Sequence, residues 1–392
     1  MIIKSNHIFT ESRERSGYLV IEDGKIKDIL ETYEGTVDYD YSDKRVIPGI
    51  IDIHNHGFGG WSMTDDASED IVRGYVKALT TIGVTTCLPT AKEGAFEAIA
   101  DVMNGEYTGA RIEGIHSEGP FWARGGENTI GMTWPLPDVE ETKRLVTKAK
   151  GVMKMMAIAP ELPGAYDVID YLHSENIKVA CCHTKAKAED IRKANDTVGL
   201  DIATHLGNGM QGIHHRNVGA LGGLLLEDNL MYEVITDLNH ICADMLKLMF
   251  RIQPYEKFCL ISDSNFIAGL PTGTYIRYGR EMYADEKGLI LNSDGRICGS
   301  GKWVLSNMEK LENVVGVAFD EIVKMASLNP ARFLHIDDKT GSIKKGKDAD
   351  VVVIDDNYNC LLTLVKGQVC YDASKDNQND YFNHEALKLK VA

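Results

Sequence analysis

One apolar stretch of this chain ends in two histidines: Val46-Ile47-Pro48-Gly49-Ile50-Ile51-Asp52-Ile53-His54-Asn55-His56. Residues two apart on an extended strand project from the same face, so the imidazoles of His54 and His56 leave the strand tip together. Two imidazoles placed in this way can bind one metal ion. The stretch therefore predicts a buried strand that carries metal ligands at its carboxyl end.

Seven further short apolar runs follow this one, and helical periodicity fills the segments between them, as in residues 69–83 and 165–176. The eight runs occupy residues 46–53, 85–90, 112–116, 155–159, 177–182, 200–204, 231–236 and 258–262. An eightfold alternation of strand and helix is typical of a (β/α)8 TIM barrel, an α/β fold whose active site forms at the carboxyl ends of the strands. We therefore expect a barrel with its site at the ends of these runs.

Both ends of the chain show short β patterns in place of the alternation of strand and helix. Residues 18–26 predict a hairpin with an Asp-Gly turn, and residues 341–354 predict a turn followed by a strand. We expect these segments to pair into one small β-sandwich domain formed from both termini. The predicted division is 1–48 for the first part of the small domain, 49–337 for the barrel, and 338–392 for the second part with its tail. The polar tail after Tyr371 is expected to be a surface extension without a catalytic role.

The composition narrows the class of protein. With 392 residues, of which 44% are hydrophobic, the chain can bury a large core, and we expect a compact soluble protein. The formal net charge of −16 argues against a generic electrostatic grip on nucleic acid or on an anionic membrane surface. We find no signal segment and no apolar stretch long enough to cross a bilayer, so a cytoplasmic location is expected. The eight cysteines contain no Cys-x-x-Cys pair, so we interpret them as reduced and mostly buried.

Four more groups of metal-ligand or proton-transfer type each follow an apolar run: Glu118, His183, His205 and Asp263. Imidazoles and a carboxylate, without thiolates, suit Zn²⁺, Fe²⁺ or Mn²⁺ in a site that keeps a position open for water. Water bound to such an ion ionises near neutral pH and becomes a nucleophile. Asp263, after the last run, is placed to take a proton from this water and to deliver it to a leaving group.

Each of these residues has a simpler structural explanation when it is taken alone. A histidine at a strand end is commonly a hydrogen-bonded structural residue, Glu118 could accept backbone hydrogen bonds in a loop, and Asp263 could cap a helix. Six suitable groups at the ends of five strands are, however, hard to assign to chance. The pattern therefore predicts a metal-dependent hydrolase.

Longer motifs surround these residues. Besides the first histidine pair, they are His116-Ser117-Glu118-Gly119-Pro120-Phe121, Ala159-Pro160-Glu161, Cys182-His183-Thr184, Thr204-His205-Leu206-Gly207-Asn208-Gly209-Met210 and Ser262-Asp263-Ser264, with residues 327–332 and 341–350 near the end. In this order they resemble the motifs of the amidohydrolase superfamily, and within it those of the N-acetylglucosamine-6-phosphate deacetylase family. The resemblance covers nearly the whole chain.

The resemblance implies a reaction and a metal site. The reaction is hydrolysis of N-acetylglucosamine 6-phosphate to glucosamine 6-phosphate and acetate by metal-bound hydroxide, with Asp263 as the acid and base. The cofactor is one or two divalent ions per subunit, with zinc preferred over iron or manganese. The implied metal ligands are His54, His56, Glu118, His183 and His205.

The resemblance also implies how substrate is bound. The implied substrate-binding residues are Asn208, Gly209, Arg216 and His240. An acidic protein that binds a phosphate needs a local cation, and Arg216 supplies one. The expected partner is a small phosphorylated amino sugar, with no nucleic acid or membrane, and the chain is expected to form a homodimer.

The chain departs from the family's motifs at positions that the resemblance implies to contact the sugar. The family's usual Gly-His-Ser-Asn-Ala, Asn-Ala-Met and Asp-Gly-Leu-His are here Cys182-His183-Thr184-Lys185-Ala186, Asn208-Gly209-Met210 and Asp237-Leu238-Asn239-His240. The loop 122–128, around Glu127, lacks a histidine that the family commonly has. N-acetylgalactosamine 6-phosphate, or a broader class of N-acyl substrates, therefore stays open as an alternative.

Two other hypotheses predict a different pattern. A dihydroorotase-like cyclic amidase would share the barrel and the first histidine pair but should bridge its metals with a lysine, and Glu118-Gly119-Pro120 argues against it. A non-catalytic sugar-phosphate sensor on the same barrel should lose metal ligands or Asp263, and none is lost.

Overall fold

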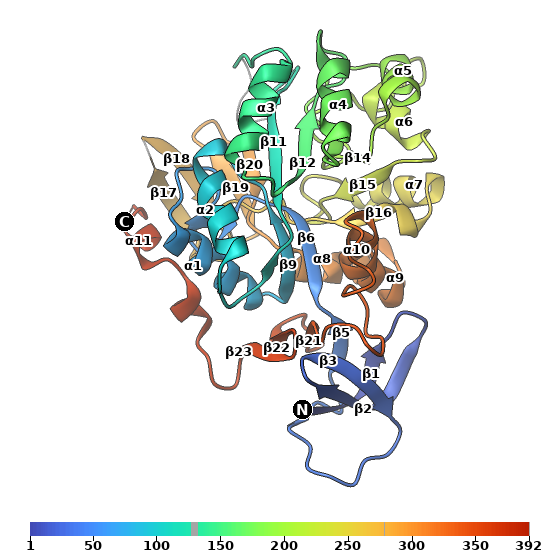
Figure 1. Cartoon of the computed structure of the whole chain (residues 1–392), viewed down its shortest axis with the longest axis vertical. Coiled ribbons are helices and arrows are strands. Elements are labelled where there is room, and N and C mark those ends of the chain that lie inside the picture. Colours follow the sequence, from blue (N-terminus) through green and yellow to red (C-terminus); the bar gives the residue numbers. More distant parts are fainter. Residues whose placement is uncertain (127–131, 278, 392) are drawn as a thin grey trace.

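The computed structural model of the chain describes residues 1–126, 132–277 and 279–391. It contains a large α/β part and a small β part that both ends of the chain build together (Figure 1). Among the described residues, no helix is long and apolar enough to span a membrane.

The large part is the predicted (β/α)8 barrel. Its eight strands, in chain order, are β6 (Ile50–Asn55), β9 (Val84–Pro89), β11 (Ile115–Phe121), β12 (Met153–Ile158), β13 (Lys178–Cys181), β14 (Ile202–Ala203), β15 (Met231–Val234) and β16 (Phe258–Leu260). Strands β11 to β16 pair in parallel in sequence order, and β9 pairs in parallel with β6 and with the short β10 (Arg111–Ile112).

Two links close this ring of strands. A parallel bridge between Thr90 and His116 joins the ends of β9 and β11. On the other side, the Asp263 amide donates to the His54 carbonyl at 2.9 Å, and the His56 amide donates to the Ser264 carbonyl at 3.1 Å. The first and last strands of the barrel therefore meet at the residues that the sequence analysis selected.

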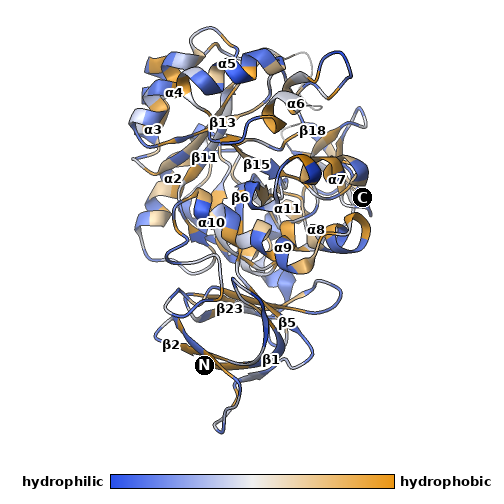
Figure 2. Ribbon diagram, turned by 90° about the vertical axis from the view of Figure 1, so that its right-hand side faces the viewer, coloured by the Kyte–Doolittle hydropathy of each residue, from blue (hydrophilic) through white to orange (hydrophobic). Residues whose placement is uncertain are grey.

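Helices cover the outside of the barrel. They are α1 (Glu69–Thr80), α2 (Glu93–Asn104), α3 (Val139–Lys148), α4 (Ala165–Ser174), α5 (Ala188–Val198), α6 (Gly219–Leu225), α7 (Ala243–Ile252), α8 (Val304–Lys310), α9 (Phe319–Val323) and α10 (Asn329–Phe333). Helix α1 shows why such segments are helical: the Ser68 side chain caps its first turn, acidic residues begin it and Lys77 lies in its last turn. Hydrophilic and hydrophobic bands alternate on these helices (Figure 2), as expected for elements that pack one face on the strands.

The barrel has two separate hydrophobic cores. The larger one fills the space between strands and helices, and a smaller one fills the inside of the ring. Because side chains alternate along a strand, neighbouring residues fall into different cores. Cys181 belongs to the outer core and Cys182 to the inner core.

The small β part, which we expected to be a β-sandwich, is built from both termini as predicted, and its strands pair into one continuous sheet. Its strands are β1 (Ile2–Phe9), β2 (Glu14–Glu22), β3 (Lys25–Leu30), β4 (Tyr39–Asp40), β5 (Arg45–Pro48), β21 (Val351–Ile354), β22 (Cys360–Val365) and β23 (Gln368–Asp372). The predicted hairpin is confirmed, since β2 and β3 pair through a turn in which Asp23 and Gly24 both have positive φ. Strand β21 pairs with β5, so both termini contribute to one apolar cluster. The boundaries at residues 48 and 337 stay a prediction.

Three features differ from the sequence analysis. The opening apolar stretch is two strands, β5 in the small sheet and β6 in the barrel, divided at Gly49, where a Cβ atom would lie 2.0 Å from the Thr85 hydroxyl oxygen. Residues 273–300, to which no structure was assigned, form a four-stranded antiparallel sheet: β17 (Gly273–Arg277), β18 (Arg280–Ala284), β19 (Leu289–Asn292) and β20 (Ile297–Ser300). The tail returns to the barrel, where the Trp61 indole donates to the Tyr381 carbonyl at 2.9 Å.

Candidate active site

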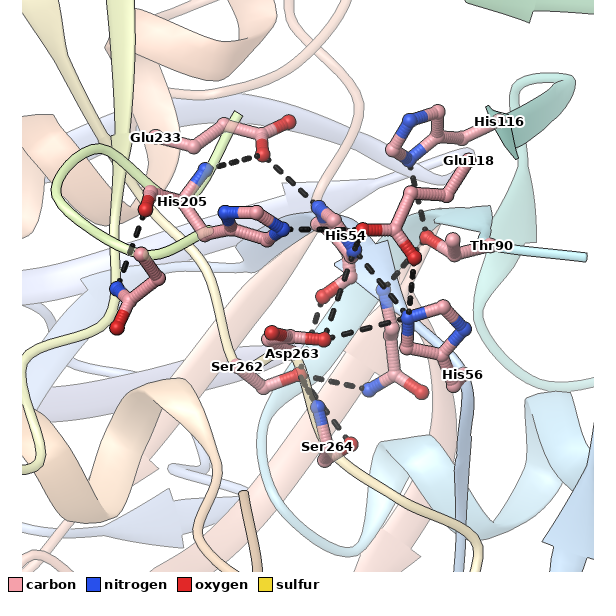
Figure 3. A network of polar contacts seen from close by, with 12 residues as sticks. His54, His56, Thr90, His116, Glu118, His205, Glu233, Ser262, Asp263 and Ser264 are labelled. Carbon is pink, nitrogen blue, oxygen red and sulfur yellow. Dashed lines mark hydrogen bonds and ion pairs between the residues drawn. The ribbon is translucent and has the colours of Figure 1, made fainter. Parts of the chain in front are cut away.

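The six residues predicted to bind metal or move protons meet at one end of the barrel. Five lie at the end of a strand or just beyond it, and the sixth lies within a strand: His54 and His56 at β6, His183 after β13, His205 after β14, Asp263 after β16, and Glu118 within β11. Figure 3 shows five of them pointing toward one another. The structure thus brings all six together, while their roles remain predictions.

Glu118 lies at the centre of this cluster. Its Oε1 atom is 3.1 Å from Nε2 of His183 and 3.0 Å from Nε2 of His205. Its Oε2 atom is 3.3 Å from Nε2 of His56. Oε1 thus faces His183 and His205 and lies 4.0 Å from Nε2 of His54, while Oε2 faces His56, so this carboxylate contacts both halves of the cluster.

The second half of the cluster contains the first histidine pair and Asp263. The Nε2 atoms of His54 and His56 are 3.3 Å apart. Asp263 Oδ1 lies 3.5 Å from Nε2 of His54 and 3.3 Å from Nε2 of His56 (Figure 3). The carboxylate of Asp263 is therefore close enough to both imidazoles to contact the same bound ion or water molecule.

The backbone at three of these positions has an unusual conformation. His183, His205 and Asp263 have φ values of 44°, 30° and 46°. Residues other than glycine seldom adopt positive φ, and such strain gathers at functional sites, where the surrounding structure holds it. Positive φ thus recurs within three residues of three strand ends, at positions of predicted ligands and of the predicted proton carrier.

Glu233 was not selected from the sequence, although it forms hydrogen bonds to two residues of the cluster. It lies in β15 with no exposed surface. Its Oε2 atom accepts hydrogen bonds from Nδ1 of His54 at 2.9 Å and from the His205 amide at 3.2 Å (Figure 3). A carboxylate on Nδ1 leaves Nε2 of His54 as the atom that faces the site. A single acidic residue within the apolar run 231–236 was the available signal.

A second buried carboxylate ties the first strand to the last. Asp52 Oδ2 accepts from the Ser262 hydroxyl at 2.6 Å and from the Asn55 amide nitrogen at 3.0 Å. Asp52 has no exposed surface. The two elements that carry His54 and Asp263 are therefore held in register by side-chain bonds as well as by backbone bonds.

The electrostatics of the half that contains His54 and His56 favour positive charge, whereas burial lowers the pKa of His183 in the other half. Burial alone would lower the pKa of His54, but the carboxylates of Glu233, Asp263 and Glu118 outweigh it and raise the pKa to about 10. Burial likewise opposes charge on His56, yet Asp263 and Glu118 raise its pKa to about 9. In return, burial would raise the pKa of Asp263, but His54 and His56 hold it well below its usual range. A site that stabilises cations inside a buried ring suits a metal ion.

The donor atoms also fit a metal ion. Among the described residues, three groups have one ligand atom per residue within 4.8 Å of one another, and the last two share His54: Glu118, Cys182, His183 and His205; His54, His56 and Asp263; and His54, His116 and Glu233. The first two groups contain the predicted halves of the site. The thiol of Cys182 in the first group was not predicted, because the sequence analysis interpreted the cysteines as structural.

The predicted substrate residues fall into two sets. Asn208 and Gly209 touch the cluster: the Asn208 amide nitrogen donates to the His205 carbonyl at 3.1 Å, and Gly209, at φ 61°, lies so close to His183 that a Cβ atom would be 2.7 Å from its Nδ1. His240 and Arg216 lie farther along the loops.

His240 is nearly buried, and its Nδ1 atom lies 2.8 Å from Asp237 Oδ2. Burial would lower the pKa of His240, but the hydrogen bond to Asp237 and the charges of Asp237 and Asp263 outweigh it and raise the pKa above its ordinary value. Arg216 is exposed in the loop between β14 and α6, with Nη1 2.7 Å from Nε2 of His215.

The altered loop after β11 packs on one ligand. The rings of Trp122 and His183 are 4.3 Å apart between centroids, and the amides of Ala123 and Arg124 both donate to the His183 carbonyl at 3.0 Å. Glu127, at the centre of the sequence difference noted above, lies outside the described residues. The described part of the loop therefore acts on the position of His183.

Comparisons with known proteins identify the family of this chain. The model of the amidohydrolase family matches residues 45–370. N-acetylglucosamine-6-phosphate deacetylase of Bacillus subtilis (strain 168) is 30% identical, over 96% of this chain and 99% of the relative. N-acetylgalactosamine-6-phosphate deacetylase of Escherichia coli O157:H7 is 30% identical, over 82% of this chain and 86% of the relative.

Solved structures give the same picture. A mutant of N-acetyl-D-glucosamine-6-phosphate deacetylase from Mycobacterium smegmatis, in complex with N-acetyl-D-glucosamine-6-phosphate, is 25% identical with a TM-score of 0.83, over 94% of this chain and 99% of that one. N-acetylglucosamine-6-phosphate deacetylase from Pasteurella multocida, at 24% identity and over the same shares of both chains, has a TM-score of 0.85 and so shares the fold.

Proposed function

Because the chain belongs to the amidohydrolase family, in the branch of the amino-sugar 6-phosphate deacetylases, we propose that it hydrolyses N-acetylglucosamine 6-phosphate to glucosamine 6-phosphate and acetate. Enzymes of this family are metal-dependent hydrolases of carbon–nitrogen bonds. The observation that carries the proposal is the position of Asp263 beside two ligand groups that share Glu118.

The proposed cofactor is zinc. Glu118, His183 and His205 would hold one ion, and His54 and His56 would hold a second. When bound, such a cation polarises the amide carbonyl and lowers the pKa of water. The two imidazoles without a dedicated carboxylate form the weaker half, so this half is expected to lose its ion first.

Asp263 would move the proton. Its neighbours keep the carboxylate ionised, so it is ready to accept a proton from the attacking water. The water oxygen bonds to the acetyl carbon, and the proton passes from Asp263 to the amide nitrogen as the carbon–nitrogen bond breaks. The protonated amine then leaves as the amino sugar, and acetate remains as the second product.

The phosphate would bind to Arg216. Its guanidinium stands on an exposed loop in a chain of net charge −16, so it offers a local cation to an anionic substrate. A charge-assisted contact of this kind contributes about 1.5–3 kcal/mol, which is roughly one to two powers of ten in affinity. The galactosamine epimer is the second candidate substrate, because the relative from Escherichia coli O157:H7 that bears its name is 30% identical.

The test is acetate release from N-acetylglucosamine 6-phosphate, N-acetylgalactosamine 6-phosphate and the two free sugars. Arg216→Ala should raise KM for the phosphorylated sugars by about 10- to 100-fold and hardly change the rate with the free ones. Arg192→Ala, an exposed arginine on α5, is the matched control and should behave as the wild type. Equal kcat/KM for phosphorylated and free sugars would move the proposal to a broader N-acyl amidohydrolase.

A further inference from the structure

Cys182 places a fourth donor atom beside Glu118, His183 and His205. Its Sγ atom lies 3.5 Å from Glu118 Oε1 and 3.7 Å from His205 Nε2. The ligand atoms of all four residues lie within 4.8 Å of one another. The thiol therefore belongs to the ligand cluster itself, at a position where the family that this chain resembles usually has glycine.

The orientation of Cys182 follows from the strand that precedes it. Its neighbour Cys181 is the last residue of β13 and points into the outer core, between strands and helices. Cys182 points into the ring and has no exposed surface. The two adjacent cysteines are thus alike in burial and opposite in direction, which makes Cys181 a matched control.

The spacing of the four donor atoms suits one cation. Zinc bonds of about 2.3 Å to sulfur and about 2.0–2.1 Å to nitrogen or oxygen, at tetrahedral angles, separate neighbouring donor atoms by roughly 3.3–3.6 Å. Four of the six separations are 3.0 and 3.1 Å between Glu118 and the two histidines, and 3.5 and 3.7 Å from the sulfur to Glu118 and His205. The two longer separations are those of the sulfur, which is also the atom that forms the longer bond to zinc.

We propose that the Cys182 thiolate is a fourth protein ligand to the cation held by Glu118, His183 and His205 in this chain. Coordination forms a sulfur–metal bond and releases the thiol proton to solvent, with no transfer of electrons between ligand and metal. A thiolate favours zinc over iron(II) or manganese(II), which prefer nitrogen and oxygen ligands. The inference rests on the proposed function only in requiring a cation at this site.

A consequence concerns the other half of the site. Four protein ligands fill a tetrahedral zinc site, whereas a catalytic site keeps a position open. In this chain, the open position would therefore have to be provided on the side of His54, His56 and Asp263. Substitution of both His54 and His56 should therefore remove activity while the bond between the metal and Cys182 remains.

The test uses cobalt(II) as the probe and no substrate. The wild type, Cys182→Ser and Cys181→Ser are freed of metal with a chelator and reloaded with cobalt(II), and near-ultraviolet absorption is recorded. The wild type and Cys181→Ser should show a thiolate-to-cobalt charge-transfer band, and Cys182→Ser should lack it. Zinc affinity of Cys182→Ser should fall by about tenfold or more, since even partners outside the ligand set change affinity by about 10–100-fold.

Several outcomes would overturn the proposal. A wild-type protein that binds cobalt(II) without the band, or a band that survives in Cys182→Ser, would show that the thiol is not a ligand. If Cys182→Ser does not fold, Cys182→Gly replaces it, because glycine is usual here in the family. X-ray absorption of the zinc-loaded wild type gives an answer without any variant, and absence of a sulfur neighbour at the zinc would refute the bond. Inactivity toward amino sugars would leave all these readouts unchanged, so the two proposals fail separately.

Discussion

Glu233→Gln tests whether the buried carboxylate that bonds to His54 and His205 raises the affinity of the site for metal. Glutamine has the shape of glutamate and keeps one oxygen that can accept from Nδ1 of His54 and from the His205 amide, but it removes the negative charge. Both hydrogen bonds are of ordinary length, at 2.9 and 3.2 Å, and Glu233 has no exposed surface. The substitution therefore changes charge with little change of packing.

The magnitude follows from these two bonds. A hydrogen bond to a charged group contributes about 1.5–3 kcal/mol and a neutral one about 0.5–1.5 kcal/mol, so each bond loses roughly 1 kcal/mol. Both bonds are also present without metal, so about 2 kcal/mol is the upper bound on the lost binding free energy, and a loss of roughly 10- to 30-fold in zinc affinity is expected, within the 10–100-fold known for such supporting carboxylates. The loss should fall mainly on the half that contains His54, since its imidazole is held by Glu233 directly.

The assay is a zinc titration of metal-free protein against a coloured chelator. Glu189→Gln is the control and should bind zinc as the wild type does, because Glu189 is an exposed glutamate on α5 whose side chain pairs with Lys187. Glu233→Leu should be worse than Glu233→Gln, because it leaves two buried donors without an acceptor. Wild-type zinc affinity in Glu233→Gln, with the protein folded, would refute the assignment of Glu233 as the group that positions His54.

Three other substitutions test separate parts of the account. Asp263→Asn should keep nearly all of the bound metal and lose at least ~10²-fold in turnover; near-wild-type turnover would contradict its role. Gly209→Ala should cost about 1–3 kcal/mol of stability through its φ of 61° and weaken zinc binding by displacing His183, whereas Gly212→Ala, whose Cβ meets nothing within 4 Å, should do neither. His173→Asn should lower stability in urea by about 1 kcal/mol or less near pH 5.5, with a smaller loss near pH 9. A hydrogen bond to aspartate raises the pKa of His173, so its contribution is complete below the unfolded pKa of about 6.5 and lost as pH rises through the folded value.

Much of the barrel could be predicted from the sequence because its signals are local. Each strand of a (β/α)8 barrel is buried on both faces, so it appears as a short apolar run, and the ligands follow the runs directly. The predicted fold is confirmed, and the six residues chosen as ligands or proton carriers meet at one end of the ring. Their convergence follows from the fold, because all carboxyl ends of parallel strands lie on the same side.

The features that were missed depend on contacts between distant segments. Glu233 and Cys182 lie within apolar runs, and only the direction in which each side chain points separates a supporting or ligating residue from a core residue. The division at Gly49 depends on the hydroxyl of Thr85, 36 residues away in the sequence. Arg216 follows no apolar run, so no pattern predicts a role for it, and its contacts in the described structure are its neighbours His214 and His215.

The central claim is that this cluster is a metal-dependent deacetylase site. Its most direct test is to strip the protein of metal, titrate zinc back, and measure acetate and glucosamine 6-phosphate released from N-acetylglucosamine 6-phosphate at each step. The account predicts no release from metal-free protein and equal amounts of both products as zinc binds. Product release that is unchanged by removal of metal, or no acetate at full zinc occupancy from any N-acetylated amino-sugar 6-phosphate, would contradict it.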